Sequence, residues 1–143
     1  MKVKDIMTAK VSTVTQESSV NDAAGIMRDL NVGAVPVCDN NNQPVGIVTD
    51  RDIVLRNIAS GGNGGAPVRD VMTANIIYGT PDMDANEAAR LMAQKQIRRL
   101  PIVENNKIVG IVSLGDLAVK EKSDMEAAKA LSSISIPSKP NNK

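Results

Sequence analysis

The chain has 143 residues, a formal net charge of +1, no histidine and one cysteine. Tyr78 is its only aromatic residue, so a buried core must be built from Val, Ile, Leu, Met and Ala. Near-neutral charge and the lack of aromatic side chains for base stacking argue against a nucleic-acid-binding protein. The absence of histidine removes the usual catalytic triads and most metal-site patterns. We therefore expect neither catalytic residues nor a bound metal.

The sequence predicts a soluble cytoplasmic protein. The N-terminal stretch MKVKDIMTAKVSTVT lacks the apolar run of a signal peptide, and no stretch approaches the roughly 18 apolar residues of a membrane span. A single cysteine fits a reducing compartment. Cys38 ends a predicted strand and is expected to be a small buried side chain. We expect a cytoplasmic location and no insertion into a membrane.

The chain contains an internal duplication. Three matching segments occur in the same order, at an offset of 65 residues (70 − 5) or, after one residue is lost in a turn, 64 (110 − 46). They are VKDIMT (3–8) with VRDVMT (68–73), VPV (35–37) with LPI (100–102), and GIV (46–48) with GIV (110–112). Ordered matches over most of the chain indicate two copies of one unit.

The first copy predicts two helices and a hairpin. Ser19-x-x-Asp22 is typical of a helix start, and Val20, Ala23, Ala24, Met27 and Leu30 then fall on one helical face. Strands are expected at 34–38 and 44–48 around an Asn-rich turn, followed by a helix over 50–58.

The second copy repeats this order. Asp84-x-x-Glu87 begins its first helix, and strands are expected at 100–103 and 107–112. A last helix runs from Leu114 into Lys122.

This interpretation divides the chain into four parts. They are a first repeat (1–60), a Gly-rich linker that is flexible by composition (61–67), a second repeat (68–122), and a short helical extension with a disordered tail (123–143). Each repeat, at about 60 residues, has little core of its own. The two copies are therefore expected to pack on each other as a pseudo-twofold α+β body.

Each copy places a hydroxyl residue three positions before an aspartate, as Thr49/Asp52 and Ser113/Asp116. One interpretation is structural: the hydroxyl caps the helix and the acid favours the positive end of the helix dipole, although Asp reaches back less well than Glu or Gln. The alternative is a ligand site, in which the hydroxyl meets a phosphate and the carboxylate accepts two vicinal ribose hydroxyls. The pattern alone leaves both open.

The ordered motifs V-x-D-I-M-T, V-P-V, G-I-V-T-D-R-D and G-I-V-S-L-G-D resemble those of tandem CBS domains (cystathionine β-synthase type, the Bateman module). The resemblance covers about residues 3–120. It implies two β-α-β-β-α repeats packed through their sheets with pseudo-twofold symmetry. It further implies that adenosine-containing ligands bind in two clefts between the repeats, and that modules form homodimers.

Carried over by position, the resemblance implies that Asp52 and Asp116 hold ribose hydroxyls, while Thr49 and Ser113 lie at the phosphate or ribose side. The other nucleotide-binding residues that it implies border the adenine, line the cleft walls or reach the phosphates: Thr13, Val14, Ala34, Val35, Pro36, Tyr78, Arg98, Arg99, Leu100 and Pro101. Arg98 and Arg99 replace a Gly-Ala pair of the first copy, and a solvated edge is the alternative interpretation of the two arginines.

We therefore expect a stand-alone regulatory module without a cofactor. Its regulatory ligand is AMP, ADP, ATP or S-adenosylmethionine, and it signals to an enzyme or transporter partner in trans. The alternative is a ligand-free dimerisation module with vestigial clefts. An enzyme acting through the paired acids is a third hypothesis, which the lack of an accompanying base, nucleophile or metal cluster disfavours.

Overall fold

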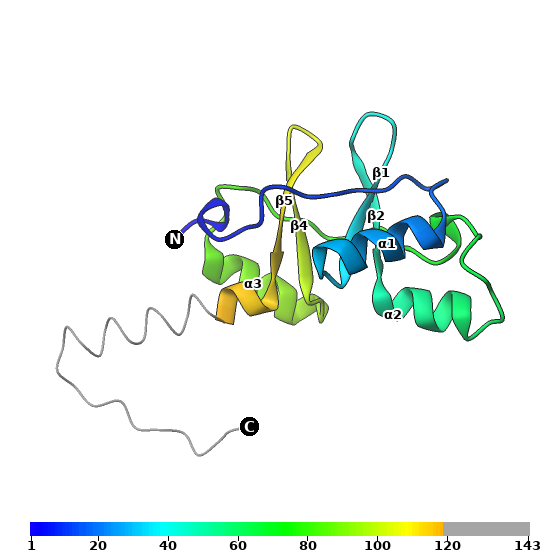
Figure 1. Ribbon diagram of the computed structural model, residues 1–143. Coiled ribbons are helices and arrows are strands. Elements are labelled where there is room, and N and C mark those ends of the chain that lie inside the picture. The colour runs from blue at the N-terminus through cyan, green and yellow to red at the C-terminus, as the bar shows by residue number, and fades with distance from the viewer. Residues whose placement is uncertain (119–143) are drawn as a thin grey trace, which may run out of the picture.

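The computed structural model of the protein describes residues 1–118. Two hairpins stand beside each other, with helices toward one end of both (Figure 1). No helix within the described part of the chain is long and apolar enough to cross a membrane. The predicted extension and tail over 123–143 lie outside the described residues. The elements are α1 (Val20–Leu30), β1 (Ala34–Cys38), β2 (Pro44–Thr49), α2 (Asp50–Ile53), β3 (Thr73–Ala74), α3 (Ala85–Lys95), β4 (Arg99–Glu104) and β5 (Lys107–Ser113).

Shorter helical turns lie between these elements. They are 3-10 turns over Val3–Asp5 and Val68–Asp70, a π turn over Val54–Ile58 that continues α2, and a helical segment over 114–118.

The predicted hairpins and helix starts are confirmed. β1 pairs antiparallel with β2, and β4 pairs antiparallel with β5. Asn42 and Asn105 adopt positive φ in the hairpin turns, as asparagine tolerates. The cap of α1 is reciprocal between Ser19 and Asp22. In α3 the Asp84 carboxylate instead accepts from the backbone N–H of Asn86 at 2.8 Å.

Each repeat contributes its first segment to the sheet of the other repeat. β3, from the second copy, pairs with Gly46 and Ile47 of β2 and makes a third strand of the first sheet. In the opposite direction, Thr8 and Ile111 of β5 exchange backbone hydrogen bonds of 2.9 and 3.0 Å. The two copies are therefore interlocked through their backbones.

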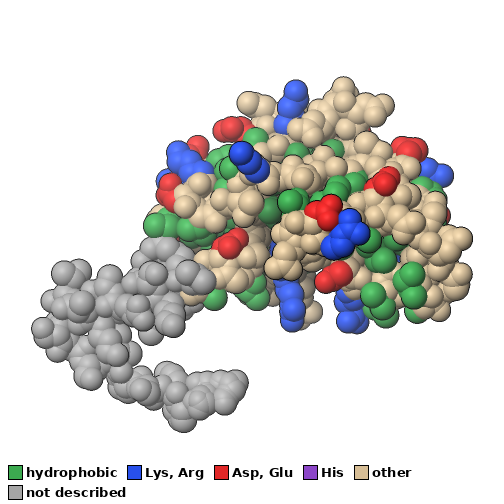
Figure 2. Space-filling model, in the orientation of Figure 1, with side chains coloured by type: hydrophobic (Ala, Val, Ile, Leu, Met, Phe, Trp, Pro, Cys, Tyr) green, Lys and Arg blue, Asp and Glu red, His purple; other side chains and the backbone are tan. Residues whose placement is uncertain are grey.

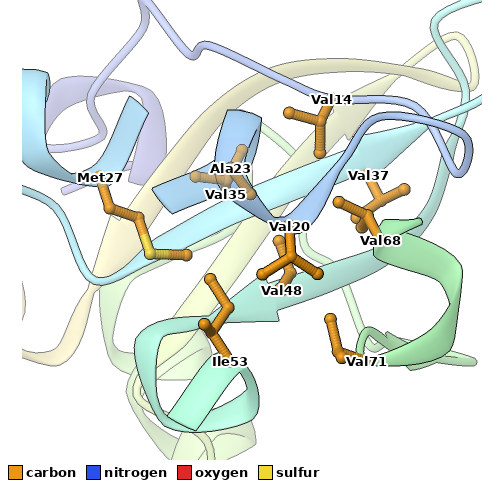
Figure 3. Close-up of a cluster of buried hydrophobic side chains, with 10 residues drawn as sticks. All are labelled: Val14, Val20, Ala23, Met27, Val35, Val37, Val48, Ile53, Val68 and Val71. Carbon is orange, nitrogen blue, oxygen red and sulfur yellow. The ribbon is translucent and has the colours of Figure 1, made fainter. Parts of the chain in front are cut away.

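The hydrophobic cores follow the same exchange. The first core packs Val68 and Val71 of the second copy among side chains of α1, β1, β2 and α2 (Figure 3). The second core packs Val3 of the first copy among side chains of α3, β4 and β5. These three valines are at most 1% exposed. Neither core is complete without residues from both copies.

Close approach of the exchanged segments requires glycine in β2 and β5. A Cβ on Gly46 would lie 2.7 Å from the Thr73 carbonyl oxygen, and one on Gly110 would lie 3.0 Å from the Thr8 carbonyl oxygen. Real Cβ atoms essentially never come closer than 3.0 Å to a non-bonded heavy atom, and the Cβ on Gly110 would also lie 2.5 Å from Met7 Sδ. The glycine that begins each G-I-V motif therefore has a steric reason.

The linker predicted over 61–67 forms a turn around a buried asparagine. Asn57 is 4% exposed, and its side-chain oxygen accepts from the Gly64 N–H at 3.1 Å. The Gly64 carbonyl in turn accepts from the Asn21 N–H at 2.9 Å. Gly61 and Gly64 both adopt φ of 87°, a conformation that glycine reaches without steric cost. The glycines here allow a defined turn around a buried asparagine.

Replacing Gly46 tests the exchange of segments. Gly46→Ala is expected to lower the free energy of unfolding by about 1–3 kcal/mol, because the new methyl group meets the β3 backbone. Gly25→Ala, in α1, is the control: the nearest atom to its methyl group would be 3.9 Å away, and alanine is expected to stabilise the helix by about 0.5–1 kcal/mol. Urea unfolding measures both. Unchanged stability of Gly46→Ala would contradict the close contact between β2 and β3.

The buried thiol of Cys38 is expected to lower the free energy of unfolding at alkaline pH. The residue is 2% exposed; burial raises the pKa of its thiol, the nearby Asp39 charge adds to the rise, and a hydrogen bond with Thr13 opposes it. A raised folded-state pKa stabilises the protein below the ordinary thiol pKa of 9.0, and this contribution is lost as pH rises further. Urea unfolding from about pH 8 to pH 10 should therefore show a steeper loss of stability in the natural protein than in Cys38→Ala. Parallel curves would refute this.

Candidate ligand-binding sites

The repeated hydroxyl–acid pairs form reciprocal caps in both copies. The Thr49 hydroxyl accepts from the Asp52 N–H at 3.1 Å, and Asp52 Oδ2 accepts from the Thr49 N–H at 3.0 Å. Ser113 and Asp116 make the same two bonds at 3.0 and 2.9 Å. The structural interpretation is confirmed, and aspartate does reach back to the cap residue in each copy.

The caps use only part of each carboxylate. Within residues 1–118, the hydrogen bonds of Asp52 and Asp116 engage Oδ2 and leave each Oδ1 without a donor. Both side chains are half-buried. A carboxylate oxygen in that position is able to accept from a ligand hydroxyl. The cap interpretation and the site interpretation are therefore compatible.

β1 and β2 bring the predicted residues of the first copy together. The Val14 N–H donates to the Pro36 carbonyl at 3.1 Å, which sets the segment around Val14 along β1. Ala34 lies opposite Thr49 in the hairpin register. We call this group the first cluster; it consists of Thr13, Val14, Ala34, Val35, Pro36, Thr49 and Asp52.

The second copy repeats the arrangement on β4 and β5. The Gly79 N–H donates to the Pro101 carbonyl at 2.9 Å, and Arg99 lies opposite Ser113 in register. The Leu114 N–H donates to the Arg98 carbonyl at 2.9 Å, just as Asp50 donates to Gly33 in the first copy. The second cluster consists of Tyr78, Arg98, Arg99, Leu100, Pro101, Ser113 and Asp116.

Not every side chain in the clusters is available to a ligand. Val14, Val35 and Leu100 are 6%, 1% and 0% exposed and belong to the hydrophobic cores. They shape the strands, and only their backbone groups remain for recognition. Tyr78, by contrast, is a member of the second cluster that is 48% exposed. An exposed aromatic ring there offers a face to a planar base.

The two clusters meet at Arg99. A Cβ placed on Gly33 would lie 3.7 Å from Nη2 of Arg99 and 3.2 Å from Oδ2 of Asp50. The second copy's guanidinium therefore reaches the first copy, near the start of α2. The sequence alone did not say which site the two arginines reach, and the packing brings Arg99 close to Gly33, next to the first cluster.

Asp50 is a charged neighbour that the sequence reasoning missed. Its counterpart is Leu114, so one cluster has an exposed acid at this position and the other has an exposed leucine. Comparing the residues between the hydroxyl and the acid in the two motifs would have revealed this difference.

A shallow hollow of about 280 Å³ lies away from both clusters, on α3. Its lining is Glu87, Arg90, Leu91 and Gln94, and it includes none of the predicted site residues. This lining lacks a paired hydroxyl and acid like those of the two caps. The two clusters are therefore better candidates for a ligand site than this hollow.

The CBS domain family model matches residues 3–57 and 68–121. The chain belongs to the CBS-domain family. The CBS domain-containing protein YhcV of Bacillus subtilis is 49% identical over 133 residues, which cover 93% of this chain and 94% of that protein. The relationship therefore extends over nearly the whole of both chains.

Two solved CBS structures share the fold described above. The CBS domain pair of protein MJ0100, in complex with 5′-methylthioadenosine and S-adenosyl-L-methionine, has a TM-score of 0.79 and 27% identity, over 87% of this chain and 98% of that chain. CBSX2 in complex with AMP has a TM-score of 0.75 and 27% identity, over 85% and 97% of the two chains. These matches confirm the expected tandem CBS fold.

Proposed function

We propose that this CBS protein is a regulatory module that binds an adenosine-containing ligand, an adenine nucleotide or S-adenosylmethionine, at the two clusters. The observation that carries the proposal is the repeated carboxylate oxygen, Oδ1 of Asp52 and of Asp116, left over by a cap at the end of a strand. The ligands named for the two structural neighbours, AMP, 5′-methylthioadenosine and S-adenosyl-L-methionine, support the same ligand class.

Each cluster would bind the ligand through a carboxylate, a cap hydroxyl and strand backbone, and the first cluster would add Arg99. The free carboxylate oxygen of Asp52 or Asp116 accepts ribose hydroxyls, and the cap hydroxyl of Thr49 or Ser113 lies beside it. The backbone around each strand borders the adenine. Arg99 supplies positive charge near the first cluster, which favours a ligand that carries phosphate.

Signalling would follow from the interlocked packing. A ligand shifts the protein toward one arrangement only as far as it binds that arrangement more tightly. Both cores contain segments from both copies, so a change at one cluster is transmitted to packing in the other repeat. We propose that the module acts as a homodimer in the cytoplasm, binds without turnover, and passes this change to an enzyme or transporter in trans.

A ligand-free dimerisation module is the second candidate. The observation in its favour is that both hydroxyl–acid pairs already serve as reciprocal helix caps. In that case the sequence pattern needs no ligand to explain it, and substitution of the two acids decides between the two functions.

Removing the acids separates binding from capping. Asp52→Ala and Asp116→Ala are each expected to weaken AMP or S-adenosylmethionine binding by about 1.5–3 kcal/mol, because a charge-assisted contact to ribose is lost. Asp22→Ala is the matched control, since Asp22 forms the same kind of cap in α1 without a proposed ligand role. Calorimetric titration measures affinity. Fluorescence of Tyr78, the only aromatic residue, follows the second cluster separately.

The acid variants also test the dimerisation module. If Asp52→Ala and Asp116→Ala lose stability as Asp22→Ala does, while the natural protein binds none of these ligands, the pairs are caps alone.

Arg99 tests the recognition of phosphate. Arg99→Gln is expected to weaken the binding of AMP by about tenfold or more and to leave the binding of adenosine nearly unchanged, because only the charged ligand loses a partner. Lys107→Gln is a control that removes a positive charge from the distant hairpin turn of β5. Equal losses for AMP and adenosine would show that Arg99 does not contact phosphate.

A further inference from the structure

The turn over 61–67 contains the only Asn-Gly pair of the chain, Asn63-Gly64. The turn lies at the outer edge of the first repeat, after α2 (Figure 1), and Figure 2 shows that edge mainly in tan, the colour of backbone and uncharged polar side chains. Asn63 is exposed, whereas Gly64 is buried. The side chain of the pair therefore meets water, while the residue that follows it is enclosed.

Glycine at position 64 has a steric reason. Its φ is 87°, a conformation that glycine adopts without steric cost, and a methyl group there would overlap the side chain of Asn21. The Gly64 carbonyl accepts from the Asn21 N–H at 2.9 Å, which joins the turn to the start of α1. The fold therefore requires a glycine directly after Asn63.

The Asn63 side chain is folded back along the peptide that follows it. Its Oδ1 accepts from the Gly65 N–H at 3.0 Å, which is the bond of an Asx turn. This bond holds the side-chain amide along the backbone of Gly64, and it draws electrons away from the amide carbon, Cγ. An aspartate could make the same turn. Asparagine differs because a backbone nitrogen can displace its amide group.

This displacement is an intramolecular reaction between neighbouring groups. A base takes the proton of the Gly64 nitrogen, this nitrogen bonds to Asn63 Cγ, and the side-chain nitrogen takes up a proton and leaves as ammonia. The product is a cyclic imide, and water then adds to either of its carbonyl groups. Breaking the new bond to Cγ gives aspartate. Breaking the bond to the main-chain carbonyl gives isoaspartate, in which the main chain runs through the former side chain.

Asn57 restrains the nitrogen that has to react. The Gly64 N–H donates to Oδ1 of Asn57 at 3.1 Å, and Asn57 is 4% exposed. A base in the solvent reaches this proton only when the bond opens, as for any buried amide in hydrogen exchange. Gly62 adds to the restraint, since its N–H donates to the Asn57 carbonyl at 2.8 Å. The reacting carbon thus belongs to an exposed side chain, and the reacting nitrogen is protected.

We propose that Asn63 is a site of spontaneous covalent modification and that Asn57 restrains this reaction in the folded protein. Because only water and a base are needed, the rate depends on how often the turn opens. Isoaspartate places an extra carbon atom in the main chain before Gly64, and this displaces Gly64 from its bonds with Asn57 and Asn21. Modified molecules therefore lose the link between the turn and α1.

Peptide mapping of the full chain during incubation at mildly alkaline pH measures the reaction. The natural protein is expected to convert Asn63 at least about tenfold more slowly than a free peptide of residues 59–67, because the Gly64 N–H is bonded. Asn57→Leu has a similar volume but no acceptor. It is expected to convert Asn63 about tenfold faster than the natural protein, because one hydrogen bond is lost. Asn57→Asp keeps an acceptor oxygen and should remain slow.

Gly46→Ala is the control for a general loss of stability, since it disturbs β2 and β3 and leaves the turn intact. Its Asn63 should convert as slowly as in the natural protein. Hydrogen exchange gives a second readout: the Gly64 N–H should be protected in the natural protein and exchange faster in Asn57→Leu. Equal conversion in the natural protein and the free peptide, or in the natural protein and a folded Asn57→Leu, would overturn the proposal. If Asn57→Leu does not fold, the comparison with the peptide decides.

The modified protein tests the consequence. Molecules that contain isoaspartate at position 63, separated by chromatography, are expected to unfold at a lower urea concentration than the natural protein, because Gly64 is displaced. Asn63→Asp is the matched control. It adds the same charge, keeps the main chain and the acceptor of the turn, and should unfold nearly as the natural protein does. An unchanged midpoint for the isoaspartate form would contradict the loss of the link to α1. These readouts contain no ligand and are independent of the nucleotide titrations.

Discussion

The exchange of first segments between the two copies is the constraint on which the rest of the structure depends. Backbone bonds between Thr8 and Ile111, and between β3 and β2, fix where each strand pair lies relative to the other copy. They need glycine in β2 and β5, because any larger residue would collide with the incoming backbone. Each copy of roughly 60 residues would expose much of its apolar surface alone. The exchange supplies the missing core valines to both.

The candidate sites are a consequence of the same arrangement. Each hairpin ends with a hydroxyl residue at the start of a helix, and each is bordered by an upstream segment bonded to a proline carbonyl. The cap holds the carboxylate through one oxygen, Oδ2, and thereby also fixes the position of Oδ1. Under the proposed function, one side chain would both cap the helix and contact the ligand. This explains why the pattern of residues alone could not distinguish them.

The two halves are similar in backbone and different in surface chemistry. Arg99 and Asp50 bring opposite charges close to Gly33, while the matching position beside the second cluster carries Leu114. Leu30 at the end of α1 is an exposed apolar side chain, and its counterpart in α3 is the exposed Lys95. Duplication therefore gave one fold twice.

The sequence by itself determined the duplication, the hairpins, the first helix of each copy and the two caps, because these depend on short-range periodicity and on residues three positions apart. Tertiary structure alone decided which copy completes which core, that the glycines of 61–67 wrap a buried Asn57, and that Arg99 reaches the first copy. These features join residues far apart in the chain. From composition alone, such residues are predicted to be flexible or solvated. The residues that they contact are distant in sequence and come close only in the folded structure.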